Sequence, residues 1–202
     1  MTTAAMRQTN LDDTAGGHRG RLLSGMATAL VEKGYGAVTI ADVARHARVS
    51  KRTFYEHFAD KQECFLAVYA AASDRLLHVV GEAARPELDW RDQVRAAVSA
   101  YLTALQSDPA LTRAMLLELP SAGPEALRLR RRGQQDFAAM LVERVELSPA
   151  MATAVIGGLN ELVLEAVEDG RADRLTDLAD EATDFARAVL GSGAAGSPPR
   201  TP

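Results

Sequence analysis

Hydrophobic residues recur every three or four positions along most of the chain, and no segment alternates in the strict way that a β-strand requires. The first apolar stripe predicts a helix over about 19–33, ended by Gly34. Thr39, followed three residues later by Asp42, predicts a cap for a helix over about 40–47. This periodicity indicates an all-α fold.

Two further helices follow after a tight turn. Ser50 predicts a cap for a helix over about 51–58, and Asp60 with Glu63 predicts the start of a longer helix over about 61–84. The helices on either side of the turn are too short to be stable alone. They must therefore dock on their neighbours.

The helix that follows the turn has two distinct sides. Phe54 and Phe58, four residues apart, are expected to face a small core. The preceding helix supplies the other half of that core with Ile40, Val43, Ala44 and Ala47. A rotation of about 100° per residue then places four side chains on the outward side: Arg52, Thr53, Tyr55 and Glu56.

The rest of the chain predicts five more helices. They start near Trp90, Pro109, Pro124, Pro149 and Asp177. Three of them have proline in the first turn, where a helix tolerates it, and are preceded by the caps Asp108, Gly123 and Ser148. We therefore expect nine helices, three in a small N-terminal unit and six in a larger one.

Composition sets the ends and the boundaries of these units. Residues 1–17 are polar and aperiodic, and residues 191–202 are rich in glycine and proline, so both segments are expected to be disordered. Between them the small unit is placed at 18–64 and the larger one at 65–190. With 47% hydrophobic residues, the 202-residue chain can form a packed core.

Charge divides the chain in the same way. The net charge is -4, which by itself argues against binding to nucleic acid. Residues 19–61, however, carry eight Lys/Arg against four acids and are +4, whereas residues 62–202 carry 14 against 21 and are -7. A basic unit joined to an acidic one is typical of a DNA reader attached to a domain with another role.

Several classes of function find no support in the residues. The single cysteine, Cys64, cannot form an internal disulfide and is interpreted as a packing residue, and His46 and His78 have no partner at metal-ligand spacing. Neither a catalytic constellation nor a cofactor motif is found, so we expect no enzyme, no metal and no cofactor. No secretory signal or uninterrupted apolar run of about 20 residues is seen, which predicts a cytoplasmic protein.

The stretch TIADVARHARVSKRTFYEHFADKQECF resembles the DNA-binding segment of TetR-type (tetracycline-repressor-like) transcriptional regulators. The likeness is detailed over about residues 19–69 and rests on helix number and length beyond them. It implies a helix-turn-helix whose second helix enters the major groove of DNA. It also implies phosphate contacts from residues at helix starts and edges, namely Thr39, Lys51, His57 and Lys61.

The outward side chains fit that role. Arg52 can read guanine or bind a phosphate, Thr53 can contact a thymine methyl group or a phosphate, and Tyr55 offers a rigid ring with a hydroxyl group. Ser50 joins this candidate DNA-binding set as the cap of the helix. Arg48 stands where the family usually has glycine in the turn, so a left-handed backbone there costs roughly 1 kcal/mol. A phosphate contact by Arg48 and a plain solvent-exposed side chain both remain open.

For the larger unit the resemblance implies a ligand-binding and dimerisation domain. The apolar helix at about 149–169, with Gly157 and Gly158 in its middle, suits a helix buried on two sides by a dimer interface. Candidate ligand contacts are the scattered Trp, Tyr, Phe, Met and polar residues, although ordinary core packing remains the alternative. These candidates are Trp90, Tyr101, Met115, Leu119, Phe137, Met140, Asn160 and Glu165.

Together these features predict a dimeric repressor that binds a pseudo-palindromic duplex and is released by a small apolar effector. An activator, or a regulator controlled by a protein partner, fits the residues nearly as well. A non-specific architectural DNA-binding protein belongs to a different class and is disfavoured by the acidic whole chain.

Overall fold

The computed structural model describes residues 17–144 and 147–194, with side chains to residue 191. Of the expected disordered ends, residues 1–16 and 195–202 lie outside the described residues, whereas residues 191–194 are helical and form the end of α10. Within the described part, the all-α prediction is confirmed by nine α-helices and two short 3-10 turns. The bounds are α2 (His18–Ala37), α3 (Ile40–Ala47), α4 (Lys51–His57), α5 (Lys61–Ala83), α6 (Trp90–Gln106), α7 (Pro109–Glu118), η1 (Leu119–Ala122), α8 (Pro124–Arg144), α9 (Pro149–Glu168), η2 (Leu175–Leu178) and α10 (Ala179–Ala194).

The described residues form two compact units whose boundary differs from the one expected from the sequence. The first unit comprises residues 17–74 and 108–129, and the second comprises 75–107 and 130–194 apart from the gap. The first unit thus contains the expected 18–64 segment together with the first part of α5, α7, η1 and the start of α8. The order of helices along the chain does not reveal this division. The helix α6 belongs to the second unit, but α7, which follows it, packs against α2 in the first unit.

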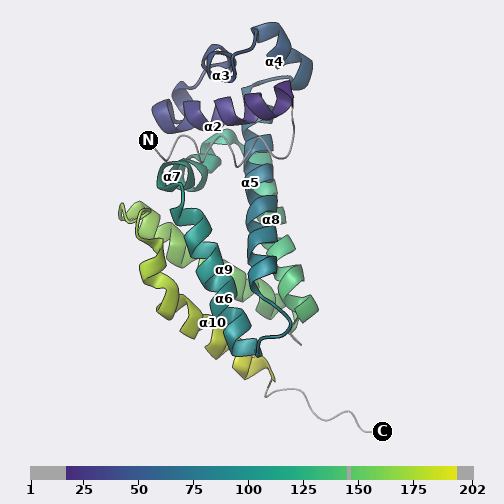
Figure 1. The fold of residues 1–202 in the computed structure, drawn as a ribbon, viewed down its shortest axis with the longest axis vertical. Coiled ribbons are helices and arrows are strands. Elements are labelled where there is room, and N and C mark those ends of the chain that lie inside the picture. Colours follow the sequence, from purple (N-terminus) through teal and green to yellow (C-terminus); the bar gives the residue numbers. More distant parts are fainter. Residues whose placement is uncertain (1–16, 145–146, 195–202) are drawn as a thin grey trace. The chain divides into compact units, whose positions relative to one another are not determined.

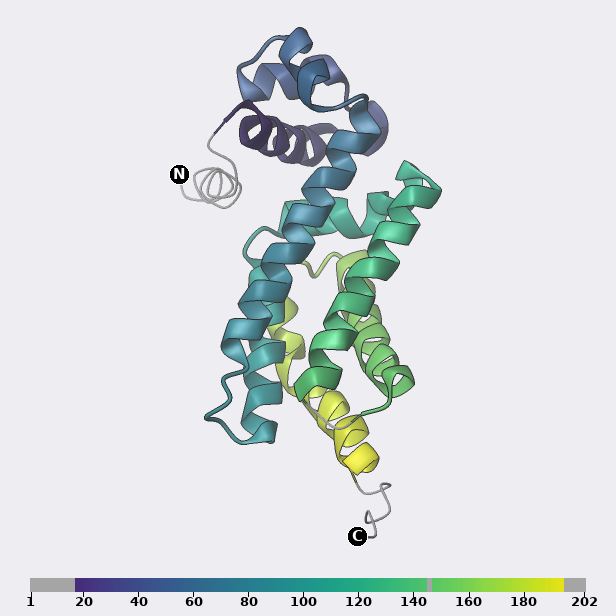
Figure 2. The same ribbon diagram turned by 90° about the vertical axis from the view of Figure 1, so that its right-hand side faces the viewer.

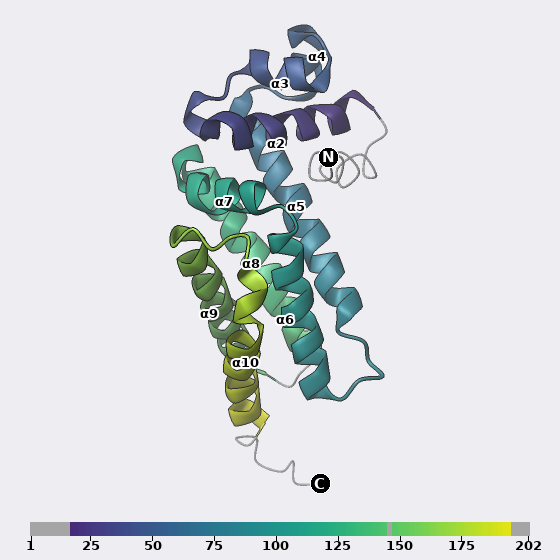
Figure 3. The same ribbon diagram turned by 60° about the vertical axis from the view of Figure 1, so that its left-hand side comes forward.

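In the first unit, α3 and α4 lie on one side of α2 and α7 lies on the other (Figures 1 and 3). The start of α5 runs through this group (Figure 2). Its core is a continuous set of buried apolar side chains, including Leu22, Met26, Leu30, Val43, Phe54, Phe65 and Val68. Burial of this surface is what holds the two short helices in place.

Local signals begin and end these helices within a residue or two of the predicted positions. Gly34 has φ 72° and ψ 156°, so the regular part of α2 ends there although the helix continues past the kink to Ala37. Asp60 accepts the Glu63 N–H at 2.8 Å, but the Glu63 carboxylate accepts from Ala59 N–H rather than from Asp60. The predicted capping box of α5 is therefore formed only in half.

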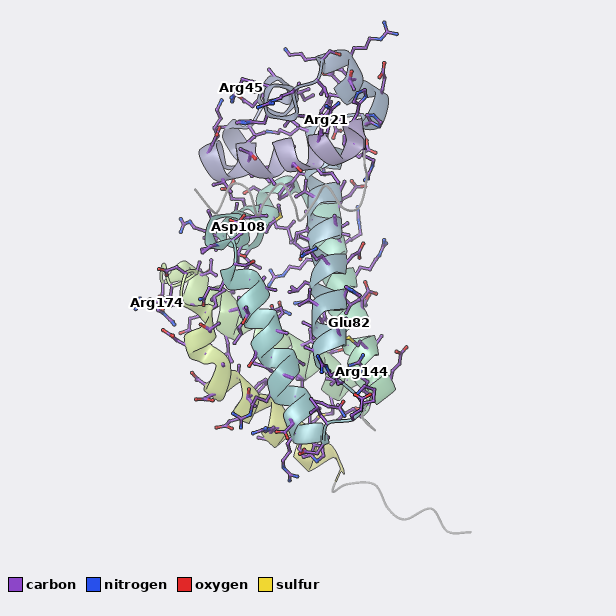
Figure 4. The ribbon with its side chains drawn as sticks, in the orientation of Figure 1. Arg21, Arg45, Glu82, Asp108, Arg144 and Arg174 are labelled. Atoms are coloured by element: carbon purple, nitrogen blue, oxygen red, sulfur yellow. The ribbon has the colours of Figure 1, made fainter. Side chains whose placement is uncertain are left out.

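The second unit is built from α6, α9, α10 and η2, with the later parts of α5 and α8. Figure 3 shows α9 and α10 side by side, and α10 also packs on α6. Between α6 and η2, the Gln106 side chain accepts both the N–H and the hydroxyl of Thr176. At the end of α5, the Arg144 guanidinium, labelled in Figure 4, donates to the carbonyl groups of Gly81 and Ala84.

Among the helices that the structure describes, two, α5 and α9, are long and apolar enough to cross a membrane by length and composition alone. Neither helix holds an uninterrupted apolar run of about 20 residues, because charged side chains such as Asp74 in α5 and Glu161 in α9 interrupt both. Core helices of water-soluble bundles have the same composition. Phe65 and Val68 of α5 are fully buried inside the first unit, and Val163 and Val167 of α9 are buried inside the second.

Candidate nucleic-acid interface

The helix α4 is held to its unit by two aromatic anchors. Phe54 is 0% exposed and Phe58, which follows the last residue of α4, is 2% exposed, and their ring centroids are 5.8 Å apart. Both residues thus face inward, as predicted. Ring burial of this kind fixes the rotation of α4 about its own axis, and with it the residues that face solvent.

The opposite side of α4 presents a row of polar and aromatic groups. Lys51, Arg52, Tyr55, Glu56 and His57 are all exposed. Tyr55 is 58% exposed, and its ring rests edge-on against the Phe54 ring at 5.6 Å. A large aromatic side chain held rigid and left in solvent is a natural contact surface for a partner.

Thr53 differs from the other outward residues. It is only half-buried, and its hydroxyl group lies 3.0 Å from that of Ser50. The Ser50 hydroxyl also accepts the Thr53 N–H at 3.0 Å, which confirms Ser50 as the cap of α4. Ser50 and Thr53 therefore order the first turn of α4, and their contact with DNA stays a prediction.

Thr39 starts α3 with the predicted capping box. Its hydroxyl accepts the Asp42 N–H, and the Asp42 carboxylate accepts the Thr39 N–H at 3.0 Å. Lys33 of α2 donates to the same carboxylate at 2.6 Å. These bonds, from Lys33 first and then from Thr39, hold the pKa of the Asp42 carboxyl well below its usual range. Thr39 itself is exposed, on the edge of the candidate interface.

Arg48 adopts the left-handed backbone that its position in the turn suggested. Its φ is 53° and its ψ is 45°, and it is the only non-glycine residue with positive φ among those described. The Arg48 N–H closes α3 by bonding to carbonyl groups of its last turn. The side chain is exposed at the turn that leads into α4. The strain of this backbone, about 1 kcal/mol, is thus present.

Gly25 is a residue of this unit that periodicity does not single out. A Cβ atom there would lie 2.7 Å from the Val43 carbonyl oxygen and 2.9 Å from the Ala47 nitrogen. The backbones of α2 and α3 therefore approach each other at a point where only glycine fits. A glycine inside a helical stripe is a signal of close approach, but the sequence does not say which helix it meets.

Lys61 is placed differently from the other candidate phosphate contacts. Its Nζ donates to the Tyr35 carbonyl at 2.9 Å and lies 4.6 Å from the centre of the Tyr35 ring, and its side chain is half-buried. The Tyr35 N–H in turn donates to the Glu118 carboxylate of α7. Lys61 thus joins the end of α2 to the start of α5, and a phosphate contact from it stays a prediction.

Cys64 lies in the core beneath this surface. It is 0% exposed, and burial raises the pKa of its thiol to about 12. Within the described residues, no group of three or more His, Cys, Asp or Glu side chains is placed to hold a metal ion. His46 instead has its Nε2 2.9 Å from the Glu32 carboxylate.

The candidate ligand contacts divide between the two units. Met115 and Leu119 are buried in the core of the first unit. In the second, the Tyr101 hydroxyl donates to Asn160 Oδ1 at 3.0 Å, and the Tyr101 ring meets the Phe137 ring edge-on at 6.2 Å. The remaining candidates also belong to the second unit, with Trp90 and Met140 half-buried and Glu165 exposed. Their role in ligand binding stays a prediction.

Comparison with known proteins bears on the first unit in particular. Residues 22–68 match the model of the bacterial regulatory proteins of the tetR family. The HTH-type transcriptional activator FasR of Mycolicibacterium smegmatis is 38% identical over 90 residues, which are 45% of this chain. The match spans 41% of that relative, so the chain aligns with only about two fifths of its length.

Solved structures extend the likeness of fold to most of the chain. The fatty acid degradation regulator FadR from Bacillus halodurans has a TM-score of 0.73 at 18% identity, over 88% of this chain and 96% of that one. FadR from Bacillus subtilis, solved in complex with stearoyl-CoA, has a TM-score of 0.71 at 17% identity, over 82% and 96%. The TetR family regulator PfmR from Thermus thermophilus has a TM-score of 0.60 at 25% identity, over 85% and 97%. The segment that matches the tetR family, residues 22–68, is the one that builds the capped α3, the turn at Arg48 and the exposed face of α4, so the likeness to these bacterial regulatory proteins covers the candidate interface.

Proposed function

We propose that this protein is a homodimeric transcriptional regulator that binds a specific DNA duplex through α4. The observation that carries the proposal is the two-sided character of α4, with Phe54 buried and Lys51, Arg52 and Tyr55 in solvent. A helix anchored by aromatic residues and presenting a guanidinium, an ammonium and a phenol can enter a major groove. Such a regulator works in the bacterial cytoplasm, where its DNA lies.

The proposed dimer forms through α9 and α10. A Cβ atom at Gly157 would meet no heavy atom within 4 Å, so this side of α9 is open in a single chain. Leu164, seven residues further along the helix, lies on nearly the same face and is only half-buried. A second copy that covers this face would give two recognition helices related by a two-fold axis, which suits a pseudo-palindromic duplex.

We propose that a small apolar effector controls DNA binding. The first specific candidate departs from that description, since it is a long-chain acyl-CoA thioester with an apolar acyl chain and a large anionic CoA part; one structural relative is a fatty acid degradation regulator and another was solved with stearoyl-CoA. The effector must bind the DNA-incompetent form of the dimer more tightly than the competent form, since equal affinity for both shifts nothing. Repression by occupation of the operator, relieved by the effector, is the leading form of control.

Activation is the second form of control that an observation favours. The relative that is 38% identical over 90 residues is an activator, and that alignment extends beyond the 47 residues of the family segment. Transcription in vitro from a promoter that carries the selected duplex separates the two forms. A repressor lowers the transcript level and an activator raises it.

The proposal is tested by selection of bound DNA from random genomic fragments, followed by titration of the selected duplex. We expect one pseudo-palindromic motif, and binding that weakens as salt rises, because phosphate contacts release counterions. Equal affinity for every sequence at physiological salt would instead establish the architectural alternative.

The effector is tested with stearoyl-CoA against free CoA as the matched control. Stearoyl-CoA should raise the melting temperature of the protein and lower its affinity for the selected duplex by about 5- to 150-fold, and the duplex should weaken stearoyl-CoA binding by the same factor. Binding of stearoyl-CoA that is identical with and without DNA would remove it as the effector.

A further inference from the structure

Two opposite charges face each other across one turn of the outer surface of α4. Nε of Arg52 lies 3.3 Å from Oε1 of Glu56, four residues later in the helix. Both side chains extend into solvent, with exposed fractions of 90% and 54%. Because the buried Phe54 ring holds the other side of α4, the pair lies on the face assigned to DNA.

The two charges are poorly placed for the stability of the helix. The backbone dipoles of a helix favour acidic side chains in its first turn and basic ones in its last turn. Arg52 lies in the first turn of α4 and Glu56 in the last, so each charge stands at the unfavourable end. An exposed ion pair of this spacing stabilises a helix only weakly, and less when the basic residue comes first. Helix stability therefore does not explain the arrangement.

Readout of a base does explain it. A guanidinium recognises guanine by donating two parallel N–H groups to O6 and N7. Glu56 engages the Nε–H of Arg52, whereas the structure gives neither Nη group a partner within the described residues. Because Glu56 already restrains one edge of the Arg52 guanidinium, the side chain loses less conformational entropy when its outer edge binds a base. The Glu56 carboxylate also repels the DNA phosphates, so it weakens non-specific binding that depends on phosphate contacts alone.

We infer that Glu56 is a specificity-determining positioning residue, which holds Arg52 so that the outer edge of its guanidinium reads one guanine in each half-site. The inference rests on the proposed function, because it requires α4 in the major groove. Glu56 itself contacts no base. Its charge lowers the affinity for DNA of arbitrary sequence. The pair thus binds DNA less tightly overall but distinguishes guanine from the other bases more strongly.

The test is selection from a random duplex library with the full-length wild type, Arg52→Ala, Glu56→Ala and the double variant. The wild type should select guanine at one position of each half-site, and Arg52→Ala should lose that preference. Glu56→Ala should lose most of the preference for guanine at the same position, where one base contact discriminates against the wrong base by about 5- to 150-fold. The double variant should lose no more of this preference than Arg52→Ala does. Glu56→Ala should also bind random-sequence duplex more tightly than the wild type.

Asp74→Ala is the matched control, since it removes an exposed acid of the first unit outside α4. It should leave the selected motif unchanged, and all four variants should keep the melting temperature of the wild type within a few degrees. A Glu56→Ala motif identical to that of the wild type overturns the inference. So does relaxation at a position that Arg52→Ala does not affect, because Glu56 would then read a base directly. Failure of the wild type to select any motif overturns the proposed function as well.

Discussion

Arg48 combines a strained backbone with a charged side chain exposed to solvent. Its left-handed backbone ends α3 and leads into α4, and its exposed side chain lies at the edge of the candidate interface. Glycine adopts this conformation without a clash between Cβ and the following carbonyl group. A phosphate contact would explain why an arginine occupies this strained position.

Arg48→Gly should therefore raise the free energy of unfolding by up to about 1 kcal/mol, with part of the gain offset by the greater freedom of glycine in the unfolded chain. Urea denaturation measures this change. The same variant should bind DNA less tightly, with a salt slope reduced by about 1, if the guanidinium contacts a phosphate. Arg48→Ala keeps the strain while removing the charge, so it should weaken DNA binding without stabilising the fold. Unchanged affinity in both variants would assign Arg48 to solvent.

Cys64 represents the residues that serve only the core. Its thiol is fully buried and its pKa is raised to about 12, so hardly any thiolate exists in the folded protein at pH 8. A thiol-specific colorimetric reagent should react with native protein only as fast as the protein opens, and at once in denaturing urea. Rapid labelling of the native protein would contradict the packing role.

At the level of elements, α2 and α3 are joined by a polar link as well as by the core. The Asp42 carboxylate accepts from Lys33 of α2 while it caps its own helix through Thr39. This link ties the start of α3 to the end of α2. It also makes the position of the helix-turn-helix depend on one charged group.

The depressed pKa of Asp42 predicts an acid-dependent loss of stability. A carboxyl group whose pKa is lower in the folded protein stabilises it fully above the unfolded value of about 3.9, and the contribution is lost as pH falls below that value. Asp42→Asn should unfold at a lower temperature than the wild type at pH 7. The difference should shrink as pH is lowered from 5 to 3, as followed by circular dichroism. A difference that stays constant over this range would mean that the charge of Asp42 does not matter.

At the level of the whole molecule, assembly depends on which faces a single chain leaves uncovered. Two adjacent glycines of α9 behave differently in this respect. A Cβ at Gly158 would lie 2.5 Å from the Phe185 ring of α10, whereas a Cβ at Gly157 would meet nothing within 4 Å. Gly158 thus belongs to the packing inside one chain, and Gly157 lies on the side assigned to the second copy.

Gly157→Leu should therefore leave the fold of each subunit intact and shift the protein from dimer to monomer, because the Cβ position is open within one chain and a bulky side chain there obstructs a second copy on this face. Light scattering reads the mass, and circular dichroism checks the helices. Gly158→Leu is the contrast, since it should destabilise the subunit itself by displacing Phe185. A Gly157→Leu protein that remains dimeric would exclude Gly157 from the interface.

The amino-acid sequence by itself determined the helices and which of them is the candidate recognition helix. Helix caps and stops depend on bonds between residues three or four apart. Thr39, Ser50 and Gly34 therefore predict where helices begin or end without reference to any distant residue. The inward turn of Phe54 also follows from helical spacing alone. These local rules account for the agreement between the expected and observed bounds of α3, α4 and α5.

Only the tertiary structure decided which distant residues meet. Gly25 has to be glycine because the backbone of α3 passes over it, and Lys61 turns to the Tyr35 carbonyl because the start of α5 lies beside the end of α2. The return of α7 to α2 brings Glu118 to the Tyr35 N–H and moves Met115 into the first unit. Such contacts join positions tens of residues apart. The periodicity of one helix records that it has a buried face but carries no information about which helix covers it.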